Sequence, residues 1–241
     1  MKKSDIIRKE IIPDDCPEYV SGYSNIELAG AYSKDKNNFE IFEKLLLKTN
    51  KNGQILNKIL IRILQHANSS VSIDAIKLLI KRGADVNYSG NQFWDAPIYI
   101  GLHLKNIKII ELLIENGADV NKKGYFGCSP LTYFIKNCDE CDNIEIIKLL
   151  IRKGSQVNYQ DNKDRCPLMI CLQSKNNDLI KLDIIKLLLD NKADIYIKDK
   201  RGKNILNYCE NNMYYSLIFN YKNLKNDNFC ECDINFIYCI S

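Results

Sequence analysis

The stretch Ile109–Asn121 reads IIELLIENGADVN, and three close relatives of this phrase occur elsewhere in the chain. They are IKLLIKRGADVN at 76–87, IIKLLIRKGSQVN at 146–158 and IIKLLLDNKADIY at 184–196. One position is equivalent in all four phrases and is occupied by Gly83, Gly117, Gly154 and Lys192. These residues are separated by steps of 34, 37 and 38 residues. A nearly constant step of this length is typical of a chain built from stacked structural repeats.

A second marker lies between the copies, at Pro97-Ile98, Pro130-Leu131 and Pro167-Leu168, with Ile205-Leu206 in the fourth place. Each marker follows the preceding glycine or Lys192 by 13 or 14 residues, whereas the step from each proline to the next phrase varies from 20 to 25. Proline suits the first turn of a helix because its φ is fixed and its missing N–H would be unpaired there. We therefore expect each marker to open a first helix, and the insertions to fall between the two helices of a unit.

The phrase itself has the pattern of a second helix. Ile109, Ile110 and Leu113 recur at the i, i+3, i+4 spacing of one helical face. Gly117 follows, where a left-handed residue ends the helix, and the next residues, ADVNKKGYFGCSP, are polar and contain glycine, as in a turn. Lys192 replaces the helix-ending glycine in the fourth phrase, at an expected cost of about 1 kcal/mol if the left-handed geometry is kept.

The pattern G-A-D-V-N followed by x-P-L resembles the ankyrin repeat, and the resemblance is strong from about residue 72 to 206. Asp199 and Gly202 before Ile205 also match the family's turn pattern, as does Gly127 before Pro130. The resemblance implies an all-α solenoid of about six helix-turn-helix units with protruding β-turn fingers. Stability in such a fold comes from stacking, since one helix pair cannot bury its own apolar stripe.

Around these units we expect an N-terminal extension or cap at 1–21, ankyrin repeats across 22–221 and a C-terminal tail at 222–241. Residues 51–70 have no fixed register because ILNKILIRIL lacks the proline. The tail either caps the last helix pair or extends free. The expected units are 22–50, 51–87, 88–121, 122–158, 159–196 and 197–221.

Composition sets bounds on the class of protein. The chain has 241 residues, 46% hydrophobic and 27% charged, as in a folded globular protein. Its net charge of +4 is spread without a basic block, which does not favour a nucleic-acid partner. No apolar run approaches the roughly 18 residues of a membrane helix, and the first residues lack the apolar stretch of a secretory signal. We expect a monomer in the cytoplasm, with the nucleus as the second compartment and no membrane partner.

Ten cysteines raise the question of a metal or redox site. Cys171 lies four residues after Pro167, where a small core residue is expected. Cys138 and Cys141 form a CxxC without a second pair at zinc-finger spacing, and the tail adds Cys230, Cys232 and Cys239. We expect free thiols, no metal and no cofactor, while a metal or redox site at these cysteines stays the alternative.

Catalytic patterns are scarce. His66 and His103 are the only histidines, and His103 falls in an expected first helix, where packing or groove lining is the commoner role. No phosphate-binding loop, metalloprotease or nucleophile-elbow motif is present. We therefore expect neither an enzyme nor a small-molecule substrate.

The turns are the expected binding region, because the resemblance implies that turn tips and first helices contact partner proteins. Aromatic pairs occur in two turns and basic residues in the next two. Exposed aromatic residues are enriched among binding hot spots, although such rings can also pack on a neighbouring turn. The candidate partner-binding residues are Phe93, Trp94, Tyr125, Phe126, Lys163, Arg165, Lys200 and Arg201.

A narrower resemblance concerns the whole chain. Lengthened loops between paired helices (KNCDECDNIE, QSKNNDLIKLD) and a Lys, Asn and Ile bias are similar to the ankyrin proteins of poxviruses. The resemblance implies a non-enzymatic module that binds a host protein to modulate host range or innate immune signalling, acting in the host-cell cytoplasm. The alternatives are a substrate-recognition adaptor of a ubiquitin ligase and a cellular ankyrin scaffold. The final residues, NDNFCECDINFIYCIS, contain no F-box-like segment, which argues against ligase recruitment.

Overall fold

The fold is helical, as a computed structural model shows. The structure describes residues 36–48, 53–65, 73–90, 96–138, 144–209 and 212–224, and no strand occurs within these ranges. The chain divides into two compact units, Met1–Tyr125 and Phe126–Ser241. The expected all-α class is therefore confirmed over the described residues.

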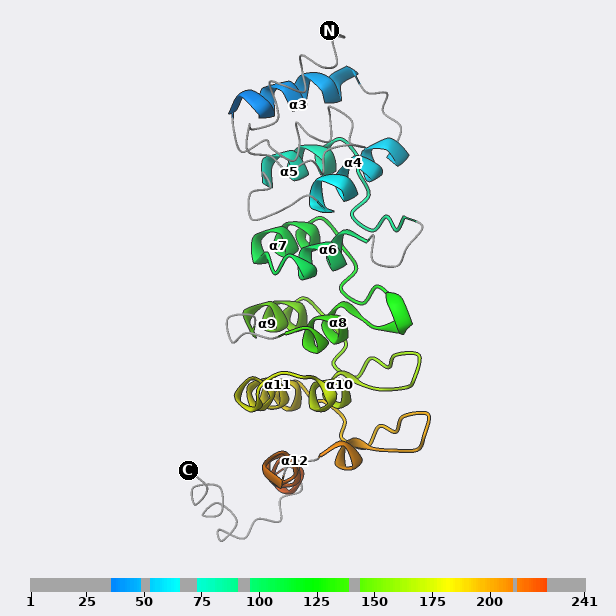
Figure 1. Cartoon of the computed structure of the whole chain (residues 1–241), viewed down its shortest axis with the longest axis vertical. Coiled ribbons are helices and arrows are strands. Elements are labelled where there is room, and N and C mark those ends of the chain that lie inside the picture. The colour runs from blue at the N-terminus through cyan, green and yellow to red at the C-terminus, as the bar shows by residue number, and fades with distance from the viewer. Residues whose placement is uncertain are drawn as a thin grey trace. The chain divides into compact units, whose positions relative to one another are not determined.

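The described part of the first unit contains two helix pairs and one further helix. Helix α4 packs against α5, and α6 against α7, with α4 also contacting α6 and α5 contacting α7 (Figure 1). Its described core is mostly aliphatic, with two buried aromatic residues, Phe42 and Tyr99. The helices are α3 (Lys36–Lys48), α4 (Gly53–Gln65), α5 (Ile73–Lys81), α6 (Pro97–His103) and α7 (Ile107–Glu115).

The second unit repeats the same arrangement. First helices α8 and α10 contact each other, second helices α9 and α11 contact each other, and each first helix packs on its own second helix (Figure 1). A short 3-10 helix, η4, contacts α10 in the place where a third first helix would lie. The elements are η2 (Tyr125–Gly127), α8 (Pro130–Lys136), α9 (Ile144–Arg152), α10 (Pro167–Gln173), α11 (Asp178–Asp190), η4 (Ile205–Tyr208) and α12 (Asn212–Leu224).

The expected first helices begin at the proline markers. Pro97, Pro130 and Pro167 are the first residues of α6, α8 and α10, which confirms the prediction. Without a proline, Ile205 opens the 3-10 helix η4, and a reciprocal cap between Asn204 and Asn207 holds its start. The fourth marker thus begins a helical turn of the tighter kind, four residues long.

The second helices end in the left-handed conformation that the glycines predict. Gly83, Gly117 and Gly154 have φ of 97°, 89° and 94°. Lys192 adopts the same conformation with φ of 67°, and its N–H donates to the Leu189 carbonyl at 2.9 Å. The geometry is kept despite the side chain, so the expected cost at Lys192 stands.

One expected loop is partly helical. The insertion QSKNNDLIKLD was predicted to lengthen the loop between α10 and α11, but α11 begins at Asp178 and has 13 residues, against 9 in α9. The side chain of Asn177 caps it by accepting the Ile180 N–H, and the buried Asn176 donates to the Ile135 carbonyl at 3.2 Å. The insertion therefore extends the second helix by more than one turn. Residues 139–143, in the other insertion, lie outside the described residues.

The asparagine that ends the repeated phrase links one helix pair to the next. In the first unit, Asn87 accepts the Asp119 N–H at 2.8 Å and donates to the Gly117 carbonyl at 2.7 Å. In the second unit, Asn158 does the same with the Asp194 N–H and the Lys192 carbonyl, at 2.8 and 3.1 Å. Both ends of each side-chain amide are thus used by the following helix end, which gives a physical reason for the repeated Val-Asn.

Candidate functional site

Two loops of the second unit, 155–166 and 193–204, extend from the same side of helices α8–α11 (Figure 1). Each loop is folded around a buried aspartate. Asp161 accepts the N–H groups of Lys163 and Arg165 at 2.8 and 2.9 Å. Asp199 accepts those of Arg201 and Lys203 at 2.9 and 2.8 Å. Because each carboxylate closes its own turn, the loop tips have a defined shape.

Backbone hydrogen bonds join these loops into a row. The Asn162 N–H donates to the Phe126 carbonyl at 2.9 Å, and the Lys200 N–H donates to the Lys163 carbonyl at 3.1 Å. Phe126 therefore neighbours the loop 155–166, which in turn neighbours the loop 193–204. We call the row Phe126, Asn162, Lys163, Lys200 and Arg201 the loop edge.

Phe126 is the unusual member of the loop edge. Its side chain is 58% exposed, and its backbone has a φ of 55°, the left-handed region that bulky residues avoid. That conformation costs a non-glycine residue roughly 1–2 kcal/mol. Tyr125, the last residue of the first unit, is 43% exposed. The turn therefore holds an exposed aromatic residue in a strained backbone conformation.

Gly127 allows the next loop to approach Phe126. A Cβ atom on Gly127 would lie 2.3 Å from Oδ1 of Asn162 and 2.9 Å from the Asn162 backbone nitrogen. Its φ of 73° is also in the left-handed region. Any larger residue would therefore push away the backbone that bonds to the Phe126 carbonyl. The loop edge therefore requires a glycine at position 127.

Arg165 braces its own loop. Its Nε and Nη2 atoms donate to Oδ2 of Asp161 at 2.9 and 2.6 Å, and Nη1 donates to Gln173 at 3.1 Å. The Arg165 side chain is only 20% exposed and that of Asp161 is 1% exposed. The guanidinium is thus occupied within the protein, and a role for Arg165 in binding a partner stays a prediction.

Arg201 is placed differently, with a side chain that is 62% exposed. Its Nε donates to Asp199 at 3.1 Å and its Nη2 to the Tyr208 hydroxyl at 3.0 Å, while that hydroxyl donates to Asp199 at 2.5 Å. The hydrogen bond from Tyr208 is the largest of the causes that lower the pKa of Asp199. Burial and the bond to Asp199 raise the pKa of Tyr208. Asp199 is therefore held as a carboxylate, and Arg201 remains accessible.

The other predicted binding residues fall into two groups. Lys163 and Lys200 are exposed, and no ion pair forms at either lysine within the described part of the chain. Phe93 and Trp94 lie outside the described residues. The structure thus brings together Phe126, Lys163, Lys200 and Arg201 in one unit.

Three of the five cysteines that the structure describes are core residues, whereas Cys128 and Cys209 are partly exposed. Cys138, Cys166 and Cys171 are buried, which confirms the core position expected for Cys171. Burial raises the pKa of Cys171 to about 12, so its thiol stays protonated at neutral pH. Among the described residues, no group of three or more metal-ligating side chains occurs. Cys141, the tail cysteines and His66 lie outside them, and His103 is exposed at the end of α6.

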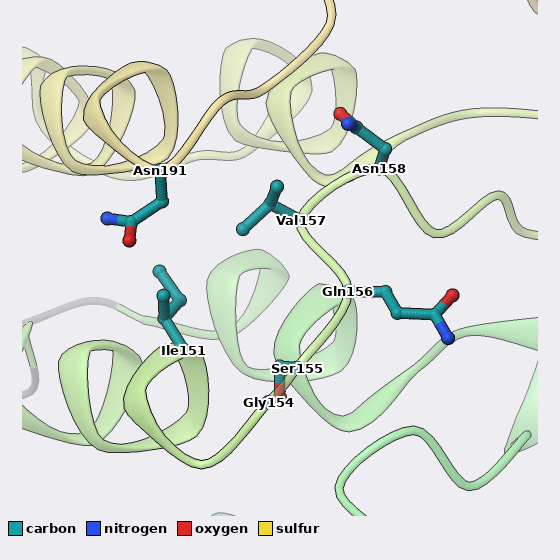
Figure 2. A pocket seen from close by; sticks show the side chains of 7 residues that line it. All are labelled: Ile151, Gly154, Ser155, Gln156, Val157, Asn158 and Asn191. Atoms are coloured by element: carbon teal, nitrogen blue, oxygen red, sulfur yellow. The ribbon is translucent and has the colours of Figure 1, made fainter.

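An open hollow of about 510 Å³ lies between the ends of α9 and α11. Figure 2 shows Val157 pointing toward Ile151 and Asn191, while Gln156 points the other way. Asn158 is engaged by the next helix end, and Asn191 donates to the Leu187 carbonyl at 2.8 Å. None of the seven lining residues is ionisable, so the hollow provides no acid, base or charged ligand: Ile151, Gly154, Ser155, Gln156, Val157, Asn158 and Asn191.

Asp161 and Asp199 were not among the predicted binding residues, although the sequence analysis placed Asp199 in the family's turn pattern. Each lies six residues before the first residue of the next helix, Pro167 or Ile205. That fixed offset is the signal that could have found them.

The comparisons with known proteins agree with this architecture. The family described as ankyrin repeats (3 copies) matches residues 100–199 and 141–226, which together cover more than half of the chain. No curated protein matches the chain. Within the described residues, every helix is too short or too polar to cross a membrane. Ankyrin repeats generally mediate binding to other proteins and are typically non-enzymatic. From the matched residues and the helix pairs together, the chain belongs to the ankyrin-repeat family.

Proposed function

We propose that this chain is a protein-binding module whose partner contacts the loop edge. The observation that carries the proposal is Phe126, an exposed aromatic side chain held in a left-handed backbone conformation. Glycine would occupy that position without strain, and a polar residue would suit a solvated loop. Strain of this kind is found at functional sites, where the surrounding structure maintains it. Aromatic residues are also enriched in the cores of protein interfaces, which fits an exposed ring on a protruding turn.

The proposed surface extends beyond Phe126. Arg201 and the exposed lysines supply positive charge on the two loops of the same row, and Arg165 is proposed to act by holding its loop in shape. Aromatic residues with a nearby arginine are typical of interface hot spots. Tyr125, Phe93 and Trp94, which belong to the first unit, are proposed as separate partner contacts.

Several finer features belong to the same proposal. We propose about six repeats across 22–221 with turn fingers, between an extension at 1–21 and a tail at 222–241. The lengthened insertions and the Lys, Asn and Ile bias support a host protein of an infected cell as the first partner to seek. A cytoplasmic location would follow from that partner.

The test is affinity capture from host-cell lysate with the full chain as bait, followed by quantitative mass spectrometry. The decisive variant is Phe126→Gly, which removes the ring and suits the positive φ. We expect it to lose at least about tenfold of the captured partner, as a hot-spot residue would. We also expect its free energy of unfolding to stay equal or to rise by about 0.5–1 kcal/mol, because the strain is relieved.

The matched control is Leu179→Ala on α11, since Leu179 is another exposed apolar side chain, at 70% exposure. Its removal should leave capture unchanged. If the Phe126→Gly variant captured the partner fully and the Leu179→Ala variant did not, the binding surface would lie on the second helices. That result would end this proposal.

A further inference from the structure

We infer that the partner binds the loop edge through an acidic segment that carries an apolar side chain at one end. The inference rests on the proposed protein-binding function and specifies the chemistry of the partner. It is argued from the distribution of charge in the second unit and from the order of residues along the loop edge.

The first helices carry no carboxylate. The sequences of α8, α10 and η4 are PLTYFIK, PLMICLQ and ILNY, without aspartate or glutamate. Their exposed or half-exposed side chains are neutral apart from Lys136. The second helices α9 and α11, by contrast, contain Glu145, Asp178, Asp183 and Asp190 among their lysines and arginines. Acidic groups are thus kept to one layer of helices.

The loops continue this asymmetry. Two of their four carboxylates, Asp161 and Asp199, are buried and bonded to Arg165 and Arg201. The remaining two are Asp164, which is half-buried, and Asp194, which is exposed. Asp194 lies at the start of its loop, four residues after α11 ends at Asp190, and accepts the Tyr196 N–H. Four lysines of the same loops are exposed. They are Lys163, Lys198, Lys200 and Lys203. The tips therefore present a net positive surface, and like charge on a partner would be repelled.

The hydrogen-bonded order gives the surface a direction. Phe126 bonds to Asn162, next to Lys163, and Lys163 bonds to Lys200. A segment lying along the row would meet an aromatic ring first and two lysines afterwards. Its apolar side chain would rest on Phe126, and its carboxylates would face Lys163 and Lys200. Charge pairs at such a rim act mainly on association rate and selectivity, while the aromatic contact supplies affinity.

The surface favours a peptide over a nucleic acid. Binding of a phosphate backbone needs a continuous row of cations, each neutralising one phosphate. Here Asp164 follows Lys163 directly, and Arg201 is already bonded to Asp199. A few carboxylates at separate points, with a neutral apolar group at one end, match the row better.

The experiment is a selection of displayed random 12-residue peptides on the immobilised full chain. Wild type, Phe126→Gly and the reversal Lys163→Glu/Lys200→Glu are selected in parallel. The control Lys153→Glu/Lys186→Glu makes the same change in net charge at exposed residues outside the loop edge, just after α9 and on α11. Anisotropy with a labelled single-stranded DNA 20-mer measures the nucleic-acid alternative on the same proteins.

Peptides recovered by wild type and by the control should be rich in Asp and Glu and contain an apolar or aromatic residue. Their affinity should fall by about tenfold or more on the Lys163→Glu/Lys200→Glu variant, because unlike charges become like. The inference would be overturned if the recovered peptides were neutral or basic, or if they bound wild type and the Lys163→Glu/Lys200→Glu variant with equal affinity. Tighter binding of the DNA than of the peptides would overturn it as well. If such non-acidic peptides still lose their affinity in the Phe126→Gly variant, the proposed function stands and only the inference of an acidic partner fails. If no peptide is recovered, both fail.

Discussion

The loops 155–166 and 193–204 of the second unit share one turn but fix it in different ways. In the first loop, Asp161 is gripped by two guanidinium nitrogens of Arg165, and both side chains are withdrawn from solvent. In the second loop, the Tyr208 hydroxyl donates a hydrogen bond to Asp199, and the Arg201 side chain is mostly exposed. Arg201 still donates to Asp199 and Tyr208, but it lies two residues after its aspartate, whereas Arg165 lies four residues after, and most of the Arg201 side chain stays exposed. The two arginines occupy equivalent loops but are available to a partner to different extents.

The loops also differ where they begin. The first follows Gly154 and the second follows Lys192, and both residues have a positive φ. Glycine reaches this conformation freely, whereas the lysine is strained. The second loop thus has a freer arginine and a more strained beginning.

The largest effect should come from removing the buried brace of the first loop. Asp161→Ala should lower the free energy of unfolding by about 3 kcal/mol, because a largely buried guanidinium and two N–H groups lose their acceptor. The free energy of unfolding is measured by urea denaturation followed by circular dichroism. The exposed Asp183→Ala on α11 is the control.

The same measurement sharpens the contrast between the two arginines. Arg165→Ala should cost about 2 kcal/mol, because the buried Asp161 then lacks its charged partner. Arg201→Ala should cost less, because Tyr208 still donates to Asp199 and solvent screens the exposed guanidinium. Equal losses would mean that the two loops are not braced differently.

An intermediate effect is expected at the helix ends. Lys192→Gly should raise the free energy of unfolding by about 0.5–1 kcal/mol, since relief of the left-handed strain exceeds the added chain entropy of glycine. Gly154→Lys should lower it by a similar amount. No atom lies within 4 Å of a Cβ added at Gly154, so the conformation alone sets the cost. A loss of stability in Lys192→Gly would contradict this account.

The smallest effect concerns acid. The folded state lowers the pKa of Asp199 below its unfolded value of about 3.9, so its stabilising contribution is present above about pH 5 and is lost as pH falls further. Asp199→Asn should flatten the decline of the melting temperature between about pH 5 and 3. Tyr208→Phe should flatten it in part, because the tyrosine hydroxyl is the largest cause of the lowered pKa. A decline as steep in Asp199→Asn as in wild type would show that other carboxylates set it.

Much of the helical framework could be predicted because its signals are local. The prolines mark the starts of the first helices, and the glycines mark the ends of the second helices. At Lys192, which replaces a glycine, the position in the repeat still predicts the helix end. The extension of α11 was missed because NNDLIKLD looks like an insertion when it is compared with the shorter units. Its capping asparagine and the spacing of Ile180 and Ile184 were signals for a helix.

The candidate site could be predicted only in part. Composition of the turns indicated aromatic and basic tips, but the sequence does not say which cations are occupied. Arg165 and Lys163 are two residues apart and both donate a backbone N–H to Asp161, yet only Arg165 also bonds to this buried carboxylate through its side chain. The neighbourhood of Lys163 and Lys200 depends on a backbone bond across 37 residues, which no local pattern encodes.

The asparagine links of the repeated phrase have a consequence for how the chain is made. Each of Asn87 and Asn158 leaves the ribosome more than 20 residues before the backbone that it will hold. A newly made helix pair therefore carries an unfilled amide that is satisfied only when its successor arrives. At these two links, the asparagine of the earlier pair is in place before the backbone groups that it bonds.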